Sequence, residues 1–260
     1  MSQASPNPGW LQSYVLPVCI YEPRPDDVFV HTTIGTSFLI NRTGYFLTAR
    51  HVLDQASAAA ANAGHRVGLI GKQDEGVSSK SGVAPLIAWQ PAPEPFDIAI
   101  GKINYSSPTL ITLRPFDVEV WQDVGTLGYP ISAHGGTPPS FRVNLRALKG
   151  YIQRKTHPED MRIGRHPDGF ELSFNVSPGM SGAPVFVHRE DMDMLIGVAV
   201  SSFRGETTES EISEVDDNGV RFTERRLRIE EYGFAHDIRG LLNWKPSFAN
   251  GKSLLDLSTE

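Results

Sequence analysis

Three short stretches of this 260-residue chain hold side chains that could together carry out acyl transfer. The first, SPGMSGAPVF, places Ser181 between Gly179 and Gly182, and glycines allow backbone N–H groups to turn toward one point. Two such N–H groups would form an oxyanion hole, which stabilises the charge that develops during acyl transfer. A plain turn entering a strand would explain this stretch equally well, so Ser181 alone decides nothing.

The second stretch, YFLTARHVLDQA, places His51 at the corner between an apolar strand and an Ala-rich segment. A histidine at such a corner is fixed by the scaffold and open at the edge, and an imidazole that titrates near neutral pH suits a general base. Taken alone, His51 could equally be a structural histidine with satisfied hydrogen bonds.

The third stretch, EPFDIAIGKI, places Asp97 directly before an apolar strand. A carboxylate so close to core residues is costly to bury unless it is hydrogen-bonded or paired. Asp97 could simply cap a strand or a turn. However, a serine hydroxyl is a poor nucleophile until a base removes its proton, and that base is usually a histidine oriented by a carboxylate. Ser181, His51 and Asp97 together are therefore the set of side chains that nucleophilic catalysis by a serine requires.

Composition narrows the class of protein. Hydrophobic residues make up 40% and charged residues 21% of the chain, as in ordinary globular proteins. The formal net charge of −6 gives no reason to expect a nucleic-acid partner, because phosphate binding requires a basic face. The single cysteine, Cys19, excludes an intramolecular disulfide and a Cys-based zinc cluster, and its apolar surroundings favour a core residue over a nucleophile.

The N-terminus, MSQASPNPGW, lacks the basic start and apolar stretch of a secretory signal, and no apolar run approaches the length that spans a bilayer. We therefore expect a soluble, cytoplasmic protein without a membrane partner.

Short apolar runs separated by Gly, Pro and Asn turns predict an all-β protein. The runs cover residues 14–21, 36–40, 45–49, 66–71, 97–103, 123–129, 141–152, 170–174, 183–187 and 194–200. Helix-forming sequence is limited to residues 54–64 and 237–244. Residues 204–219 carry a series of acidic side chains without a basic one after Arg204, which favours a solvated or mobile loop.

The order His51, Asp97, Ser181, with the sequences around these residues, resembles the trypsin/chymotrypsin-like serine peptidases. The nearest likeness is to their disulfide-free bacterial branch, as in the high-temperature-requirement proteases. The matching pieces are GTSFLI with YFLTARHVL, FDIAI, PGMSGAPVF, LIGVAVSS and YGFAHDI, supported by DVGTLGYP and DIRGLLNW. This resemblance covers about residues 14–244 and implies two six-stranded antiparallel β-barrels, a site in the cleft between them, and a C-terminal helix.

The resemblance also implies the division of the chain. An N-terminal barrel over residues 1–117 would carry His51 and Asp97, and a C-terminal barrel over residues 118–246 would carry Ser181 and end in a helix. Residues 247–260 would form a tail, and the whole would be one peptidase domain.

Carried over residue by residue, the resemblance implies Ser181 as nucleophile, His51 as general base and then acid, and Asp97 as the group that fixes the imidazole tautomer. The N–H groups of Gly179 and Ser181 would form the oxyanion hole. Met180 departs from the pattern, because secreted digestive members have an aspartate there that pairs with a newly freed N-terminus. Activation by N-terminal cleavage is therefore not expected.

The S1 pocket of the family is lined by the segment before the nucleophile, the end of the strand LIGVAVSSF and a glycine of YGFA. These positions correspond to Asn175, Val176, Ser177, Val200, Ser201, Ser202, Phe203 and Gly233. No acid is expected at the base of this pocket, so we predict a small, apolar or uncharged polar P1 residue rather than a strict Arg/Lys preference.

Three other functions compete with this interpretation. GMSGA nearly fits the G-x-S-x-G nucleophile elbow of an α/β-hydrolase esterase but misses at Ala183, and that fold requires more helices and a different residue order. His157 and His166 share a loop, but no H-E-x-x-H motif supports a metal hydrolase. A catalytically silent homologue that binds peptides stays open, because the sequence does not show whether the oxyanion loop is formed.

The interpretation favoured by the motifs is a serine endopeptidase that hydrolyses peptide bonds of a protein substrate through an acyl-enzyme. No metal or other cofactor is expected. Because a promiscuous protease would be dangerous in the cytosol, we expect restricted or regulated cleavage of a protein or peptide substrate, with a regulatory partner as one means of control.

Overall fold

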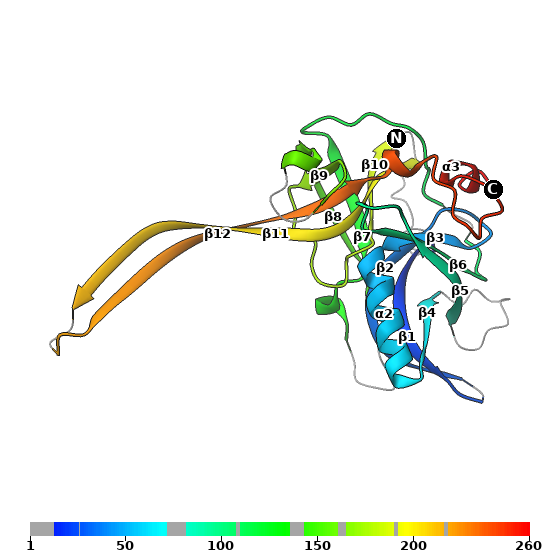
Figure 1. The fold of residues 1–260 in the computed structure, drawn as a ribbon, viewed down its shortest axis with the longest axis horizontal. Helices are drawn as coiled ribbons and strands as arrows, with labels where there is room; N and C mark the ends of the chain where they lie inside the picture. Colours follow the sequence, from blue (N-terminus) through cyan, green and yellow to red (C-terminus); the bar gives the residue numbers. More distant parts are fainter. Residues whose placement is uncertain are drawn as a thin grey trace, which may run out of the picture.

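Twelve strands form two closed antiparallel barrels in the part of the chain that this computed structural model describes (Figure 1). The described residues are 13–25, 27–71, 82–107, 110–135, 143–160, 165–189, 192–215 and 218–260. The sequence prediction of an all-β fold with two six-stranded barrels is confirmed.

The first barrel has the strand order β1-β2-β3-β6-β5-β4. Its strands are β1 Val15–Pro23, β2 Val28–Leu39, β3 Tyr45–Ala49, β4 Arg66–Ile70, β5 Val83–Pro91 and β6 Ile98–Ile103. The side chains of Phe38, Phe46 and Leu47 are fully buried and belong to its hydrophobic core. Cys19 is buried in β1, where burial raises the pKa of its thiol to about 12, as expected of a core residue.

The second barrel has the strand order β10-β11-β12-β9-β8-β7. Its strands are β7 Asp123–Gly128, β8 Arg146–Thr156, β9 Gly169–Leu172, β10 Pro184–Arg189, β11 Met192–Val215 and β12 Arg221–Asp237. Two short 3₁₀ helices, η1 Ile131–Ala133 and η2 Pro158–Asp160, lie in its loops.

The helix expected at residues 54–64 begins four residues earlier in the structure. It is α2, which covers Arg50–Ala63 and includes His51. Its N-cap residue, Ala49, offers no side-chain hydrogen bond. The free N–H groups of the first turn instead bond to Asp97, directly before the neighbouring strand β6: Arg50 N to the Asp97 carbonyl at 3.2 Å, and His51 N to the carboxylate at 3.0 Å. A tertiary contact therefore starts the helix earlier than the local sequence indicates.

The helix expected at residues 237–244 is wrong in type. The chain there forms a 3₁₀ helix, η3 Ile238–Leu241, and the only α-helix described beyond it is α3 Leu254–Leu257, which a Ser253–Asp256 capping box begins. The C-terminal segment packs on the first barrel, since the Asn41 side chain donates to the Leu257 carbonyl at 3.0 Å. Neither α-helix described is long and apolar enough to cross a membrane.

The loop expected at residues 204–219 is also wrong over residues 204–215. Residues 204–215 belong to β11, which pairs with β12 in a long hairpin that projects from the barrels (Figure 1). The acidic side chains of β11 meet arginines of β12, with Glu211–Arg225 at 2.6 Å and Glu209–Arg226 at 3.5 Å. Cross-strand pairs of opposite charge reduce the self-repulsion on which the loop prediction relied. Asp216 and Asp217 lie outside the described residues.

Candidate active site

The loop that carries Ser181 joins β9 to β10 and packs against the first barrel. The Ser181 carbonyl accepts a hydrogen bond from Thr36 N at 2.9 Å. Gly182 has a φ of +88°, and a Cβ there would lie 2.1 Å from the Thr36 carbonyl oxygen and 2.9 Å from Ala49 N. Only glycine fits both the backbone conformation and the space. This close approach places Ser181 beside the strand end that leads into His51.

His51 and Asp97 form a direct pair. The His51 Nδ1 atom lies 2.6 Å from Asp97 Oδ2, while Asp97 Oδ1 accepts from the His51 backbone N–H at 3.0 Å. An ionised carboxylate at this place accepts the proton of Nδ1, so the neutral ring leaves Nε2 free as an acceptor. The carboxylate also lies at the N-terminal end of α2, where it accepts a backbone N–H of the first turn.

The hydroxyl of Ser181 does not extend the Asp97–His51 hydrogen bond into a three-residue series in the structure. Its hydrogen bond goes to the Val200 carbonyl at 3.4 Å, and none links it to His51 among the described residues. The structure therefore brings the three predicted residues to one place and pairs two of them.

Two peptide groups of the serine loop have fixed orientations. The Pro178 carbonyl accepts from Ile131 N at 2.9 Å, and the Met180 carbonyl accepts from Ala183 N at 2.9 Å. In a trans peptide the N–H points opposite to the carbonyl, so the N–H groups of Gly179 and Ser181 point away from these contacts. Neither donates to another described residue. Two backbone donors are thus left without an acceptor beside the serine.

Interactions from both barrels hold this loop. Thr36 Oγ1 donates to the Gly179 carbonyl at 2.8 Å and accepts from Tyr129 N at 2.9 Å. Met180 is fully buried in the core of the second barrel. An apolar side chain therefore anchors the loop at the position that resembles the aspartate site of secreted digestive peptidases.

The predicted S1 residues are only partly gathered. Val176 N donates to Ser202 Oγ at 2.8 Å, and a Cβ on Gly233 would lie 2.7 Å from Val176 Cγ2. The Asn175 side chain accepts a hydrogen bond from Ser202 Oγ. These four residues share one place at the junction of β11 and β12.

The other predicted S1 residues lie around this group or apart from it. The carbonyls of Ser177 and Val200 bond to Met180 N and Ser181 Oγ, while Ser201 pairs with Phe234 in the sheet. Phe203 pairs with Tyr232, and this pair faces the opposite side of the sheet from the pair Ser202 and Gly233. The centroid of the Phe203 ring lies 5.3 Å from that of Phe234. Phe203 is therefore separated from the group at Asn175.

An acidic residue that the sequence prediction left out lies beside this group. Asn175 Nδ2 donates to Glu231 Oε2 at 2.8 Å. Glu231 precedes Gly233 by two positions in β12, so both residues face the same side of the strand. That alternation was the available signal for Glu231. The absence of an acid from the base of the S1 pocket stays a prediction, because Glu231 is exposed and its carboxylate contacts the amide of Asn175.

A second missed residue, His236, supports Asp97 from β12. The Asp97 backbone N–H donates to His236 Nδ1 at 3.1 Å, and His236 Nε2 lies 3.3 Å from His166 Nδ1. Because Nδ1 of His236 accepts, its Nε2 carries the proton and donates to His166. His236 is fully buried. No local motif marks it, since its contact joins residues 139 positions apart.

The state of His236 should make stability depend on pH. Burial, assisted by the neighbouring His166 and His51, lowers its pKa to about 4 despite the opposing effect of Asp97. Between about pH 4 and 6.5 the unfolded chain then binds more protons than the folded one, so the free energy of unfolding rises with pH in this window. The contribution, of the order of 3 kcal/mol, is complete above pH 6.5 and lost toward pH 4.

Urea unfolding between pH 4.5 and 7.5 checks this. In His236→Asn an amide oxygen can replace Nδ1 as the acceptor for Asp97, and the titration is removed. We expect a flatter pH dependence of stability in this variant than in the wild type. Equal slopes for both proteins would show that His236 does not provide the effect.

A family model described as the trypsin-like peptidase domain matches residues 35–198, more than half of the chain. No curated protein sequence matches the chain significantly. Among solved structures, the fold is similar to the HtrA-type protease AlgW with a decapeptide, at 15% identity and a TM-score of 0.55, over 87% of this chain and 61% of that one. The same protease with a tripeptide matches at 16% identity and a TM-score of 0.50, over 87% and 56%.

The chain thus spans less than two thirds of the length of these structures, and identities this low report on the fold alone. The family model, which matches residues 35–198, shows to which family the chain belongs. This chain belongs to the family of proteins with a trypsin-like peptidase domain.

Proposed function

We propose that this protein is a serine endopeptidase that hydrolyses peptide bonds through an acyl-enzyme formed on Ser181. The observation that carries this proposal is the 2.6 Å contact between His51 and Asp97, beside a serine loop with two N–H groups that find no acceptor in the described part of the chain. Membership of the peptidase family supports a hydrolase of this kind.

The first half of the reaction uses these groups in sequence. The Ser181 hydroxyl turns from Val200 toward His51 Nε2, which takes its proton as Oγ attacks the substrate carbonyl carbon. The carbonyl oxygen becomes an oxyanion, and the free N–H groups of Gly179 and Ser181 stabilise it. His51, held by Asp97, then gives the proton to the leaving amine as the peptide C–N bond breaks.

The second half reverses these roles. A water molecule loses a proton to His51 and attacks the acyl-enzyme carbonyl, and the proton returns to Ser181 Oγ as the ester bond breaks. Peptide ligands in the similar protease structures are consistent with a peptide substrate for this chain.

A fluorophosphonate probe tests the proposal, since it phosphonylates a serine activated by a neighbouring base. We expect labelling of the wild type that is lost in Ser181→Ala. A folded wild-type protein that never reacts would favour the alternative, a silent homologue that binds peptides. The serine loop argues for the enzyme, because hydrogen bonds from Ile131 N and Ala183 N to the Pro178 and Met180 carbonyls fix the directions of its two free N–H groups.

We expect cleavage after small, apolar or uncharged polar P1 residues. Asn175, at the predicted pocket base, offers an amide, and Val176 narrows the space beside Gly233. Cleavage-site profiling with a peptide library measures this preference. Cleavage confined to Arg and Lys would contradict it, and loss of that cleavage in Glu231→Gln would then assign the specificity to the carboxylate beside Asn175.

We further propose that this peptidase cuts few substrates in the cytoplasm and is controlled by a regulatory partner. The β11–β12 hairpin supports such control, because it extends directly from the strands that carry Ser202 and Gly233. Apolar side chains are exposed along it, namely Ile212, Val215, Val220, Phe222, Leu227 and Ile229. A partner that covers them would act on the strands beside the proposed S1 pocket.

A further inference from the structure

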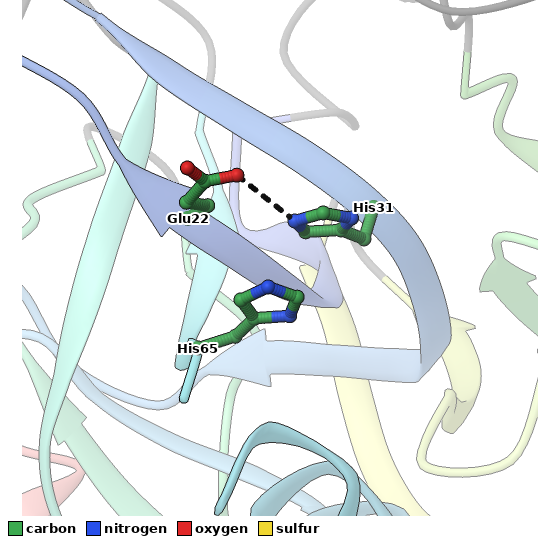
Figure 2. Close-up of side chains that lie close together, drawn as sticks. All are labelled: Glu22, His31 and His65. Atoms are coloured by element: carbon green, nitrogen blue, oxygen red, sulfur yellow. Dashed lines mark ion pairs between the residues drawn. The ribbon is translucent and has the colours of Figure 1, made fainter. Parts of the chain in front are cut away.

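Two histidines and a glutamate from three separate places in the first barrel lie close together (Figure 2). Glu22 lies near the end of β1, His31 in β2, and His65 directly before β4. One possible ligand atom of each residue lies within 4.8 Å of the others, and no other such group of three occurs among the described residues. Glu22 Oε2 is 3.5 Å from His31 Nε2.

The backbone presents all three side chains at this spot for local reasons. His31 is the extra residue of a β-bulge, since Ile20 pairs with Thr32 and Tyr21 with Val30. A bulge redirects a side chain relative to the regular alternation. His65 follows Gly64, whose φ of +68° ends α2, and the His65 N–H bonds to the Ala60 carbonyl at 2.8 Å.

We propose that Glu22, His31 and His65 form a binding site for a Zn²⁺ ion, with water in the remaining position. Imidazole nitrogens and a carboxylate oxygen are donors that zinc prefers, whereas calcium and magnesium favour oxygen donors alone. Zinc bonds of about 2.0–2.1 Å in a tetrahedron separate the ligand atoms by roughly 3.3 Å. The distance of 3.5 Å between Glu22 Oε2 and His31 Nε2 is already close to this ligand-to-ligand distance.

Binding requires movement mainly of the imidazoles. The His31 and His65 rings are stacked, with centroids 3.9 Å apart and planes 15° from parallel, so their nitrogen lone pairs do not yet converge. The His31 side chain is 31% and that of Glu22 43% exposed, which leaves room for rotation. Arg24 Nη2 lies 3.5 Å from Glu22 Oε2 and competes for the carboxylate. Zinc must displace this weak surface pair.

The position of the site indicates a structural role. Zinc would join the end of β1 and the bulge of β2 to the corner between α2 and β4. His51 is at the opposite end of α2, a helix about 20 Å long, so the ion would take no part in the proposed peptide hydrolysis.

Calorimetric titration of the full chain with Zn²⁺ tests the proposal. We expect one ion per chain, and at least about tenfold weaker binding in His31→Asn, His65→Asn and Glu22→Gln. Zinc should raise the melting temperature of the wild type but not of His65→Asn, and Co²⁺ should give the intense visible absorption of a four-coordinate ion only in the wild type.

Two controls keep the result specific. His157→Asn should bind zinc as the wild type does. His157 is exposed and pairs with Asp168, but the two do not belong to a group of three possible ligands among the described residues. Ser181→Ala should also bind zinc unchanged, which separates this proposal from that of peptidase activity. Equal zinc affinity in the wild type and all three ligand variants, or no stoichiometric binding to the wild type, would overturn the site. Melting curves in a chelator show whether each variant is folded.

Discussion

Replacing Ser181 with alanine should lower kcat/KM for peptide hydrolysis by about 10⁶-fold. The substitution removes the only atom that can form the acyl-enzyme in the proposed reaction, whereas the backbone contacts of the loop stay the same. Ser181 N keeps its direction because the Met180 carbonyl bonds to Ala183, and the Ser181 carbonyl still accepts from Thr36. The variant should therefore fold normally and bind peptides. Rates with a peptide cleaved by the wild type give the measurement.

Ser213→Ala is a matched control, because Ser213 is an exposed serine on the hairpin whose hydroxyl lies 3.0 Å from that of Thr223. It should hydrolyse the peptide at the wild-type rate. A Ser181→Ala protein that keeps a substantial part of the wild-type activity would assign hydrolysis to another group, or to a contaminating protease that active-site labelling can identify.

The barrel strands could be predicted because each carries its own signal. YFLTA of β3 and IAIGKI of β6 are almost entirely buried, and such apolar runs are visible without knowledge of their partners. The outer part of the β11–β12 hairpin has no such signal. This part of the hairpin is stabilised by cross-strand ion pairs such as Glu211 with Arg225. The acidic segment of β11 taken without β12 resembles a solvated loop.

The candidate site divides in the same way. Ser181, His51 and Asp97 lie within local motifs whose glycines and strand ends can be recognised. His236 contacts Asp97 of the other barrel, and Glu231 contacts Asn175 in the loop after β9, so their roles depend on which segments become neighbours. The same holds for the proposed zinc ligands, which the bulge at His31 and the end of α2 bring together. Spacing within one strand shows which residues share a face, but it does not show which segments become neighbours.

Replacing Asp97 with asparagine should lower kcat/KM by about 10⁴-fold with little change in folding. The His51 backbone N–H requires an acceptor, which is Asp97 Oδ1 at 3.0 Å. An asparagine that keeps this bond must turn its NH₂ group toward His51 Nδ1, where the carboxylate now lies at 2.6 Å. Nδ1 then becomes an acceptor and Nε2 carries the proton. A ring in this tautomer cannot take the proton of Ser181.

Peptide hydrolysis and the rate of fluorophosphonate labelling should both decrease in Asp97→Asn, because both need an activated Ser181. Glu94→Gln is the matched control: Glu94 is an exposed carboxylate three positions earlier, and it pairs with Arg50 rather than with His51. Its activity should remain that of the wild type. If Asp97→Asn were within tenfold of the wild type, the tautomer of His51 would not depend on Asp97. The base that activates Ser181 would then have to be held in another way, and His236, which contacts only the backbone of Asp97, cannot replace the carboxylate.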